Sequence, residues 1–245
     1  MNSGYYAACA GLRAQTQALE LVANNLANVN TNGYLGQQPT FRSLVALKYG
    51  QPAGGLNAAI NSFNVMGGTQ LDLSPGNLQQ TGNPLDLAVE GNGFFVAKTQ
   101  YGNLYTRNGS FRVSPQGQLN TADGDPVMDE TNHPIILPAG QVSISADGTI
   151  SVAGAVVSKL RIVEFVPDAT PTPVGSSYYD LPDNGVRPAA GASVRQGMVE
   201  ASNVNPVGGV MDLILVQRHA DMLQRALSLY YSDFNRIAAE DLPKV

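Results

Sequence analysis

The sequence predicts an α+β protein in which a helix at each end of the chain pairs with the other in a coiled-coil-like layer, with an all-β domain inserted between them. Three observations carry this prediction: a seven-residue apolar repeat at the start, a proline-free run with helical spacing near the end, and evenly spaced turn signals between them. The expected division is a helical assembly domain at 1–34 and 204–245, an extended connector at 35–80, and a β-rich outer domain at 81–203.

The first helix is expected between Ser3 and Tyr34, a stretch without proline. Its repeat forms two seams, one with Tyr5, Leu12, Leu19 and Leu26, and one with Ala8, Gln15, Val22 and Val29, while Leu21 falls outside both. Such a repeat is typical of a helix that lies along a partner helix. Ser3 can cap the start, and Gly33 can adopt the left-handed conformation just past the end.

The second helix is expected after Asn205, which can act as its N-cap, with Pro206 as its first residue. Apolar residues then return mostly at three- and four-residue steps. Two such helices either cover a globular core or pair with each other and with neighbouring copies. For the second alternative the candidate assembly interface is Tyr5, Leu12, Leu19, Val22, Leu26, Val29, Val210, Leu213, Leu223, Leu227 and Phe234.

The residues between the helices have the character of a turn-rich β structure. Residues 35–80 have little periodicity and many glycines and prolines, which favours a connector. From Leu85 onward, alternating apolar residues are separated by turns at Gly102-Asn103, Asn108-Gly109, Gln116-Gly117 and Asp123-Gly124, as in a β meander or barrel. Residues 159–166 are the clearest strand, 167–192 are expected to form a loop, and 194–200 are expected to form the last strand.

Composition limits the possible partners. Charged residues make up 13% of the chain and the net charge is −5, so no basic stripe is available to bind nucleic acid. No apolar run approaches the ~20 residues needed to span a bilayer, so we expect no membrane insertion. The start of the chain lacks the features of a secretory signal, which predicts export without a cleaved signal peptide.

A search for chemistry predicts no catalytic residue, no metal site, no cofactor and no small-molecule substrate. Cys9 is the single cysteine, which rules out a disulfide within the chain and a cysteine-rich zinc site. The acidic residues from Asp123 to Glu130 do not have the spacing of the roughly twelve-residue calcium loop. Gly91-Asn-Gly93 lacks the third glycine and the helix of a dinucleotide fingerprint.

Asparagine is unusually frequent at the two inner helix ends. It is a poor residue inside helices and a good one in caps and turns, so its side chains are expected to bond to backbone groups at a shaped junction. The predicted junction and cap residues are Asn24, Asn25, Asn28, Asn30, Gly33, Asn203 and Asn205.

Several stretches together resemble one family. Ala23-Asn-Asn-Leu-Ala-Asn-Val-Asn-Thr-Asn-Gly-Tyr34 closely resembles the N-terminal motif of the bacterial flagellar rod and hook proteins. The stretches Pro84–Val96, Tyr105–Val113 with Gly117–Gly124, and Gln196–Pro206 followed by Asp212 and Gln217-Arg218 look like the same family, in the same order. Length and the single β domain suit rod proteins better than the longer hook protein. Gly208-Gly209 departs from the family pattern.

The resemblance implies a structural subunit whose terminal helices form the inner layer of a tubular axial rod that transmits torque. It implies other copies of the chain, other rod proteins and the flagellar export apparatus as partners, and the basal body as location. The proximal-rod member resembles the chain most, and the distal-rod member is the alternative. The rival from another class is a soluble β-domain enzyme or ligand-binding module with helical oligomerisation arms.

Overall fold

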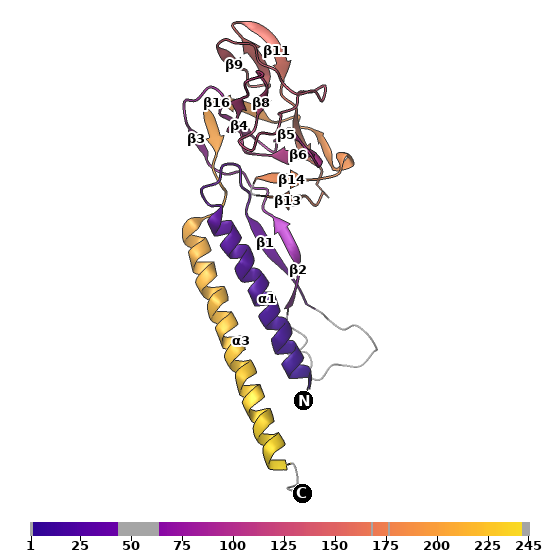
Figure 1. The fold of residues 1–245 in the computed structure, drawn as a ribbon, viewed down its shortest axis with the longest axis vertical. Coiled ribbons are helices and arrows are strands. Elements are labelled where there is room, and N and C mark those ends of the chain that lie inside the picture. Colours follow the sequence, from indigo (N-terminus) through magenta and orange to yellow (C-terminus); the bar gives the residue numbers. More distant parts are fainter. Residues whose placement is uncertain (1, 44–63, 168, 176, 242–245) are drawn as a thin grey trace. The chain divides into compact units, whose positions relative to one another are not determined.

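The computed structural model describes residues 2–43, 64–167, 169–175 and 177–241. Helix α1 (Asn2–Ala27) comes first and helix α3 (Pro206–Asp241) last, with short strands between them (Figure 1), so the α+β class is confirmed. The strands are β1 (Gln37–Ser43), β2 (Asn64–Leu71), β3 (Leu78–Gln80), β4 (Leu87–Glu90), β5 (Phe94–Thr99), β6 (Gly102–Thr106), β7 (Arg112–Val113), β8 (Leu119–Asn120), β9 (Val142–Ile144), β10 (Thr149–Val152), β11 (Ala155–Lys159), β12 (Ile162–Phe165), β13 (Thr172–Val174), β14 (Tyr178–Asp180), β15 (Val186–Pro188), β16 (Ser193–Gln196) and β17 (Met198–Glu200), with a 3₁₀ turn, η1 (Asp183–Gly185).

The chain divides into two compact units. The helical unit comprises residues 1–26, 37–70 and 205–245, and the β unit comprises 27–36 and 71–204. The residues of the expected connector include β1 and β2, which pair with each other. Residues 27–36 group with the β unit, although they follow α1 directly.

Helix α1 ends at Ala27, earlier than the sequence pattern predicts. The cause is a turn at Asn28, whose carbonyl accepts a hydrogen bond from the Thr31 amide at 3.1 Å and whose side-chain oxygen accepts one from the Thr31 hydroxyl at 3.2 Å. Asparagine side chains compete with helical bonding in this way. Val29 therefore lies past the helix end and does not continue the predicted seam.

The predicted meander or barrel is not confirmed. The largest sheet has the order β13-β14-β6-β5-β12-β15, so strands far apart in sequence are neighbours. Strands that follow each other in the sequence pair locally, in β1–β2, β5–β6, β7–β8, β13–β14 and the three-stranded sheet β11-β10-β9. The Asn108-Gly109 signal is not a hairpin turn: a Cβ on Gly109 would lie 1.6 Å from the Leu87 carbonyl oxygen, so glycine is needed there for close backbone approach.

Three further strand expectations are corrected. The stretch 159–166 is divided, since β11 ends at Lys159 and β12 begins at Ile162 after an isolated bridge from Leu160. The last strand is divided into β16 and β17 at Gly197, which has a φ of 76°. The expected loop at 167–192 contains β13, β14 and β15. Local composition does not reveal the pairing of β14 with β6 or of β15 with β12, which are further away in sequence, whereas β13 pairs with its neighbour β14.

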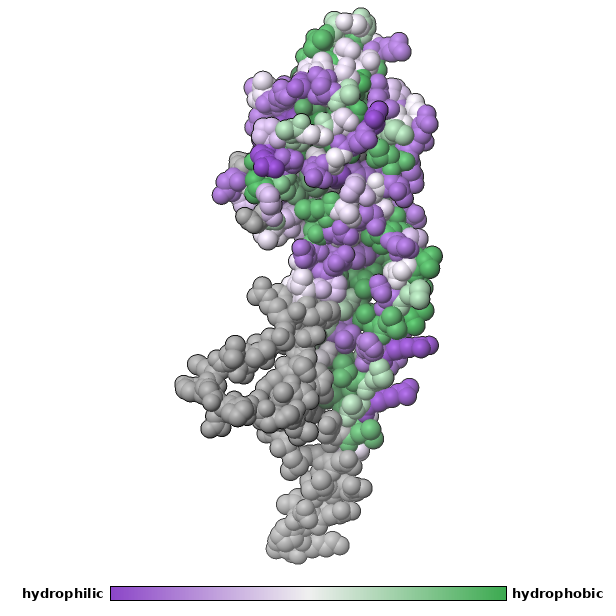
Figure 2. Space-filling view, turned by 180° about the vertical axis from the view of Figure 1, so that it is seen from behind, coloured by the Kyte–Doolittle hydropathy of each residue, from purple (hydrophilic) through white to green (hydrophobic). Residues whose placement is uncertain are grey.

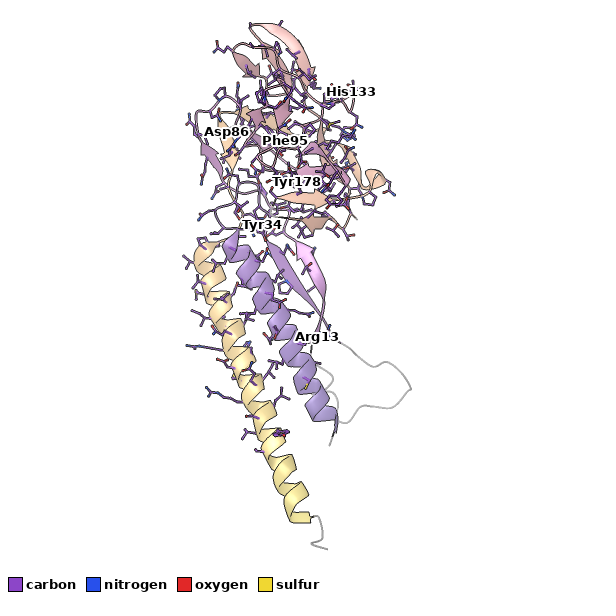
Figure 3. The ribbon with its side chains drawn as sticks, in the orientation of Figure 1. Arg13, Tyr34, Asp86, Phe95, His133 and Tyr178 are labelled. Atoms are coloured by element: carbon purple, nitrogen blue, oxygen red, sulfur yellow. The ribbon has the colours of Figure 1, made fainter. Side chains whose placement is uncertain are left out.

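The β unit has its own apolar core. One cluster gathers around Phe95, whose ring meets that of Phe111 edge-on at 5.1 Å between centroids (Figure 3). A second gathers around Phe94, which stacks on Phe165 at 4.0 Å. Aromatic pairs with these geometries add to the free energy of burial. The β unit therefore buries enough apolar surface to hold its own shape.

We expect Phe95→Ala to lower the free energy of unfolding of the β unit by about 3 to 5 kcal/mol, since it opens a cavity at a fully buried site. Denaturant unfolding of the full chain measures the change. Tyr101→Ala is the control, because Tyr101 is 80% exposed and the change there should stay within about 0.5 kcal/mol. Equal effects of the two variants would contradict the position of Phe95 in the core.

Candidate functional site

Helix α1 has a buried face that the sequence pattern did not predict. Gly11, Ala14, Ala18 and Leu21 are its buried residues, and they repeat at three- and four-residue steps. Each lies one residue before a predicted seam position, which is a rotation of roughly 100° around the helix. The seam leucines beside them are only half-buried. Two adjacent faces of α1 are therefore removed from solvent to different extents.

The buried face of α1 contacts strand β1 through Asn25. The side-chain amide nitrogen of Asn25 donates to the Gln37 carbonyl at 2.7 Å, and its amide oxygen accepts from the Gln37 N–H at 3.0 Å. Asn25 continues the spacing of Ala18 and Leu21, so this face points toward β1. Figure 1 shows the β1–β2 pair alongside α1. Small side chains on this face allow the strand pair to approach closely.

The seam side of α1 faces α3. A Cβ built on Gly209 would lie 3.8 Å from Leu26 Cδ1, so the end of α1 meets the first turns of α3. Figure 1 shows the two helices next to each other and running in opposite directions. Along α3 the less exposed positions follow the heptad steps Gly209, Leu213, Val216, Ala220, Leu223 and Leu227, which we call the inner seam.

Helix α3 also exposes apolar side chains on the side opposite the inner seam. We call this set the outer stripe: Val207, Val210, Met211, Ile214, Leu215, Met222 and Leu229. Their exposed fractions range from 44% to 69%. Arg218 and Arg225 occupy the two gaps in the stripe and can lay their aliphatic stems along it. Figure 2 shows hydrophobic side chains in green alternating with hydrophilic ones in purple along the coloured part of the helical unit.

The predicted interface residues thus fall into two groups. Half-buried side chains are Leu12, Leu19, Val22, Leu26, Val29, Leu213, Leu223 and Leu227, whereas Val210 is exposed on the flank of the outer stripe. The side chains of Tyr5 and Phe234 lie outside the described residues. Coiled-coil packing of the two helices stays a prediction.

The junction residues of the β unit surround one glycine. Gly33 has a φ of 67°, and a Cβ there would lie 2.1 Å from the Asn108 nitrogen, so no other residue fits. Its N–H donates to the Glu200 carbonyl at 2.8 Å. The neighbouring Asn32 donates from its side chain to the Ser110 hydroxyl at 3.2 Å. The segment after α1 is therefore held against the β unit.

A buried ion pair lies beside Gly33. Arg107 and Glu200 are each 1% exposed, and Nη1 of Arg107 lies 3.1 and 3.3 Å from the two carboxylate oxygens. The second guanidinium nitrogen donates to the Gly91 carbonyl at 2.9 Å, and the guanidinium carbon lies 4.7 Å from the centre of the Phe94 ring. The Gly76 N–H donates to Glu200 at 2.8 Å.

Asn203 fixes two further segments with its side-chain amide. The oxygen accepts from the Gly36 N–H at 2.7 Å, and the nitrogen donates to the Asp72 and Ser74 carbonyls at 2.9 Å each. The adjacent Leu35 N–H donates to the Tyr179 hydroxyl at 2.8 Å. Burial raises the pKa of Tyr179 far above its ordinary value, so the hydroxyl keeps its proton.

The remaining predicted junction residues serve the helix ends. The Asn205 side chain accepts from the Val207 and Gly208 amides at 3.0 and 3.1 Å and so caps α3. Asn28 forms the turn after α1, while Asn24 and Asn30 lie on the surface. Sequence reasoning missed Arg107, Tyr179 and Glu200. The first and last of these stand within the family-like stretches quoted above, which was the available signal.

The described residues offer no cluster of three side chains suited to a metal ion. In the acidic stretch, the Asp129 carboxylate accepts bonds from Thr131, His133 and Ser158. Burial raises the pKa of Asp129, but these bonds outweigh it and lower the pKa below its ordinary value. Neither described helix has the length and apolarity that a bilayer crossing requires.

Three family models match the chain. Residues 6–34 match the one described as flagella basal body rod protein, and residues 88–152 match the D1 domain of the flagellar hook protein FlgE/F/G. Residues 195–229 match the C-terminal part of the flagellar basal body rod FlgEFG protein. The three matches include α1 with its junction, much of the β unit, and the first two-thirds of α3.

Individual relatives extend over nearly the whole chain. The flagellar basal-body rod protein FlgF of Caulobacter vibrioides is 30% identical over 100% of both chains. FlgF of Salmonella typhimurium is 32% identical over 93% of this chain and 94% of its own. FlgG of Buchnera aphidicola, also a basal-body rod protein, is 32% identical over 89% of this chain and 92% of its own. On these similarities, this chain belongs to the family of flagellar basal-body rod proteins.

Proposed function

We propose that this chain polymerises with other copies of itself and with other rod proteins into the axial shaft that transmits torque in the basal body. The observation that carries this proposal is the outer stripe of α3. A helix with apolar residues on two opposite sides needs two packing partners, and within the chain only the inner seam faces another helix. Head-to-tail contacts between identical subunits generate an open helix when they do not close.

The stripe requires a hydrophobic partner rather than solvent. Its seven side chains lie between Val207 and Leu229 on one helix, with Arg218, Asp221 and Arg225 beside or between them. Exposed apolar residues gathered on one side of a helix are typical of an interaction site. We infer that helices of neighbouring subunits cover it, and that the half-buried seam residues of α1 complete the same layer.

Within the rod, we propose a proximal position, with the distal rod as the alternative. The relative that aligns over all of both chains has the proximal-rod name FlgF, whereas the FlgG relative aligns over 89% of this chain. We further propose export through the flagellar secretion apparatus without cleavage of a signal peptide. No catalytic role is proposed, because the relatives are named as rod proteins.

The rival proposal is a soluble module whose helical arms form a closed oligomer. It makes a different prediction about size, because a closed oligomer stops at a fixed number of subunits and a rod subunit does not. Negative-stain microscopy of purified chain at increasing concentration distinguishes the two. Open-ended tubes of varying length support the rod subunit, and a single closed species supports the rival.

Leu26→Asp should abolish polymerisation while leaving the β unit folded. The charge would stand against the first turns of α3, where Leu26 now lies, and an unpaired buried carboxylate is costly. Sedimentation measures assembly, and circular dichroism measures folding. Gln17→Asp adds the same charge on the exposed side of α1 and should assemble normally. Assembly of the Leu26 variant would contradict the role of the seam.

Met222→Asp should also abolish polymerisation, but without loss of helix stability in the monomer. Met222 is 59% exposed, so the carboxylate stays hydrated until a neighbouring subunit docks on the stripe. Gln224→Asp, on the polar side of α3, is the matched control and should have little effect. Rod formation in a strain that carries the chromosomal variants gives the readout. Normal rods with Met222→Asp would contradict the outer stripe as a contact surface.

In purified monomer, amide hydrogens of α1 and α3 should exchange faster than those of residues 85–200. The helical unit gains its full packing only when neighbours cover the outer stripe, whereas the core of the β unit is complete. Mass spectrometry of exchanged peptides makes this comparison. Equal protection of the helices and the β unit would show that the helices have found their partners before assembly.

A further inference from the structure

The polypeptide passes between the helical unit and the β unit four times. The passages lie between residues 26 and 27, 36 and 37, 70 and 71, and 204 and 205. In the β unit, three short segments lead to these passages: residues 27–36, 71–78 and 200–204. These three segments are the covalent connections of the β unit to the helical unit, so a force that pulls on the helices is transmitted along them.

All three segments are bound to one small group of residues inside the β unit. We call Arg107, Tyr179, Glu200 and Asn203 the anchor cluster. The first segment donates to it three times, from the amides of Gly33, Leu35 and Gly36. Each of these bonds measures 2.7 or 2.8 Å between donor and acceptor.

The other two segments join the same cluster. The second segment donates from the Gly76 amide to the Glu200 carboxylate at 2.8 Å, and its Asp72 and Ser74 carbonyls accept from Asn203. The Asp72 N–H also donates to the Gly36 carbonyl at 2.8 Å, which ties the first two segments together. The third segment contributes Glu200 and Asn203 themselves.

The cluster joins parts of the chain that are distant in sequence. Its bonds connect residues between 93 and 167 positions apart, and Arg107 and Glu200 are buried. Hydrogen bonds in such a network strengthen one another, so the loss of one segment weakens the bonds of the others. Bonds within one turn, such as the one from Asn120 to Gly124, do not have this property.

We propose that the anchor cluster is a mechanical clamp through which load on the helices enters the β unit. This inference rests on the proposed function, since a subunit of a rotating shaft must carry force between its parts. The clamp resists extraction of residues 27–36 because the Gly33 and Gly36 amides are bound to Glu200 and Asn203, which also bind the second segment, and the Leu35 amide is bound to Tyr179. In this proposal, Asn203 and Tyr179 hold the backbone segments that carry the load in place.

Pulling on single molecules of the full chain tests the clamp. One handle attaches at Cys9, the only cysteine, and the other at Gln116→Cys, in the exposed turn between β7 and β8. At constant force α1 is drawn out first, and the load then reaches Gly33. The measured quantity is the time before residues 27–36 detach, because forced unfolding is governed by the unfolding rate.

Asn203→Ala removes three hydrogen bonds and should shorten this time by roughly tenfold or more. Tyr179→Phe removes one hydroxyl and should shorten it less, without endangering the fold. Tyr178→Phe is the matched control, because the neighbouring hydroxyl bonds to Thr121 and Asp125, away from all three segments. The control should detach as slowly as the unchanged chain.

Two results would overturn the clamp. One is an unchanged detachment time in Tyr179→Phe and Asn203→Ala. The other is an equal shortening in Tyr178→Phe, which would indicate general weakening. If Asn203→Ala fails to fold, the two tyrosine variants decide alone. The pulling measurement uses single chains, so its result does not depend on polymerisation. Normal rods from the Leu26→Asp and Met222→Asp variants would contradict the proposed function but not the clamp.

Discussion

The ion pair between Arg107 and Glu200 is the interaction on which the junction of the β unit depends. Removing two charges from water costs several kcal/mol each, and mutual attraction offsets this only with good geometry and further hydrogen bonds. Here the Gly76 amide, the Gly91 carbonyl and the Phe94 ring supply further contacts, while Nε of Arg107 is buried without a hydrogen-bond partner among the described residues. The backbone of Arg107 in turn shapes the site where only a glycine fits, at Gly33. A buried pair thus fixes where the chain from α1 must pass.

The two units bury their apolar residues by different means. The β unit surrounds its phenylalanines with its own strands. Helix α3 presents one apolar side to the chain and leaves the other exposed, and under the proposed function a neighbouring subunit covers the exposed side. In the proposed rod, the β unit is stable in the single chain, whereas the helices gain the last part of their stabilisation from contacts with neighbouring subunits.

Periodicity in the sequence predicted the two helices, because a long repeat remains recognisable despite local irregularities. It did not predict the buried face with Ala14 and Ala18, since alanine contributes little to an apolar pattern and is selected there for its size. The end of α1 was missed because the Asn28 side chain competes with the next helical bond. Pairing of β14 with β6 joins residues more than seventy positions apart, which no local pattern reveals.

The sequence predicted that asparagines form the junction, but it did not predict that Arg107 and Glu200 are buried there. Where the chain leaves regular structure, backbone N–H and C=O groups of several segments need hydrogen-bond partners at once. A side-chain amide suits this place because it both donates and accepts hydrogen bonds. Asn203 satisfies one N–H and two carbonyls, which neither a carboxylate nor an ammonium group can do. A charged residue in a strand, in contrast, is usually a surface residue, so burial of Glu200 could not be predicted before Arg107 was placed beside it. The junction therefore combines neutral amides, which hold backbone, with one ion pair, which fixes the distance between the strands that supply it.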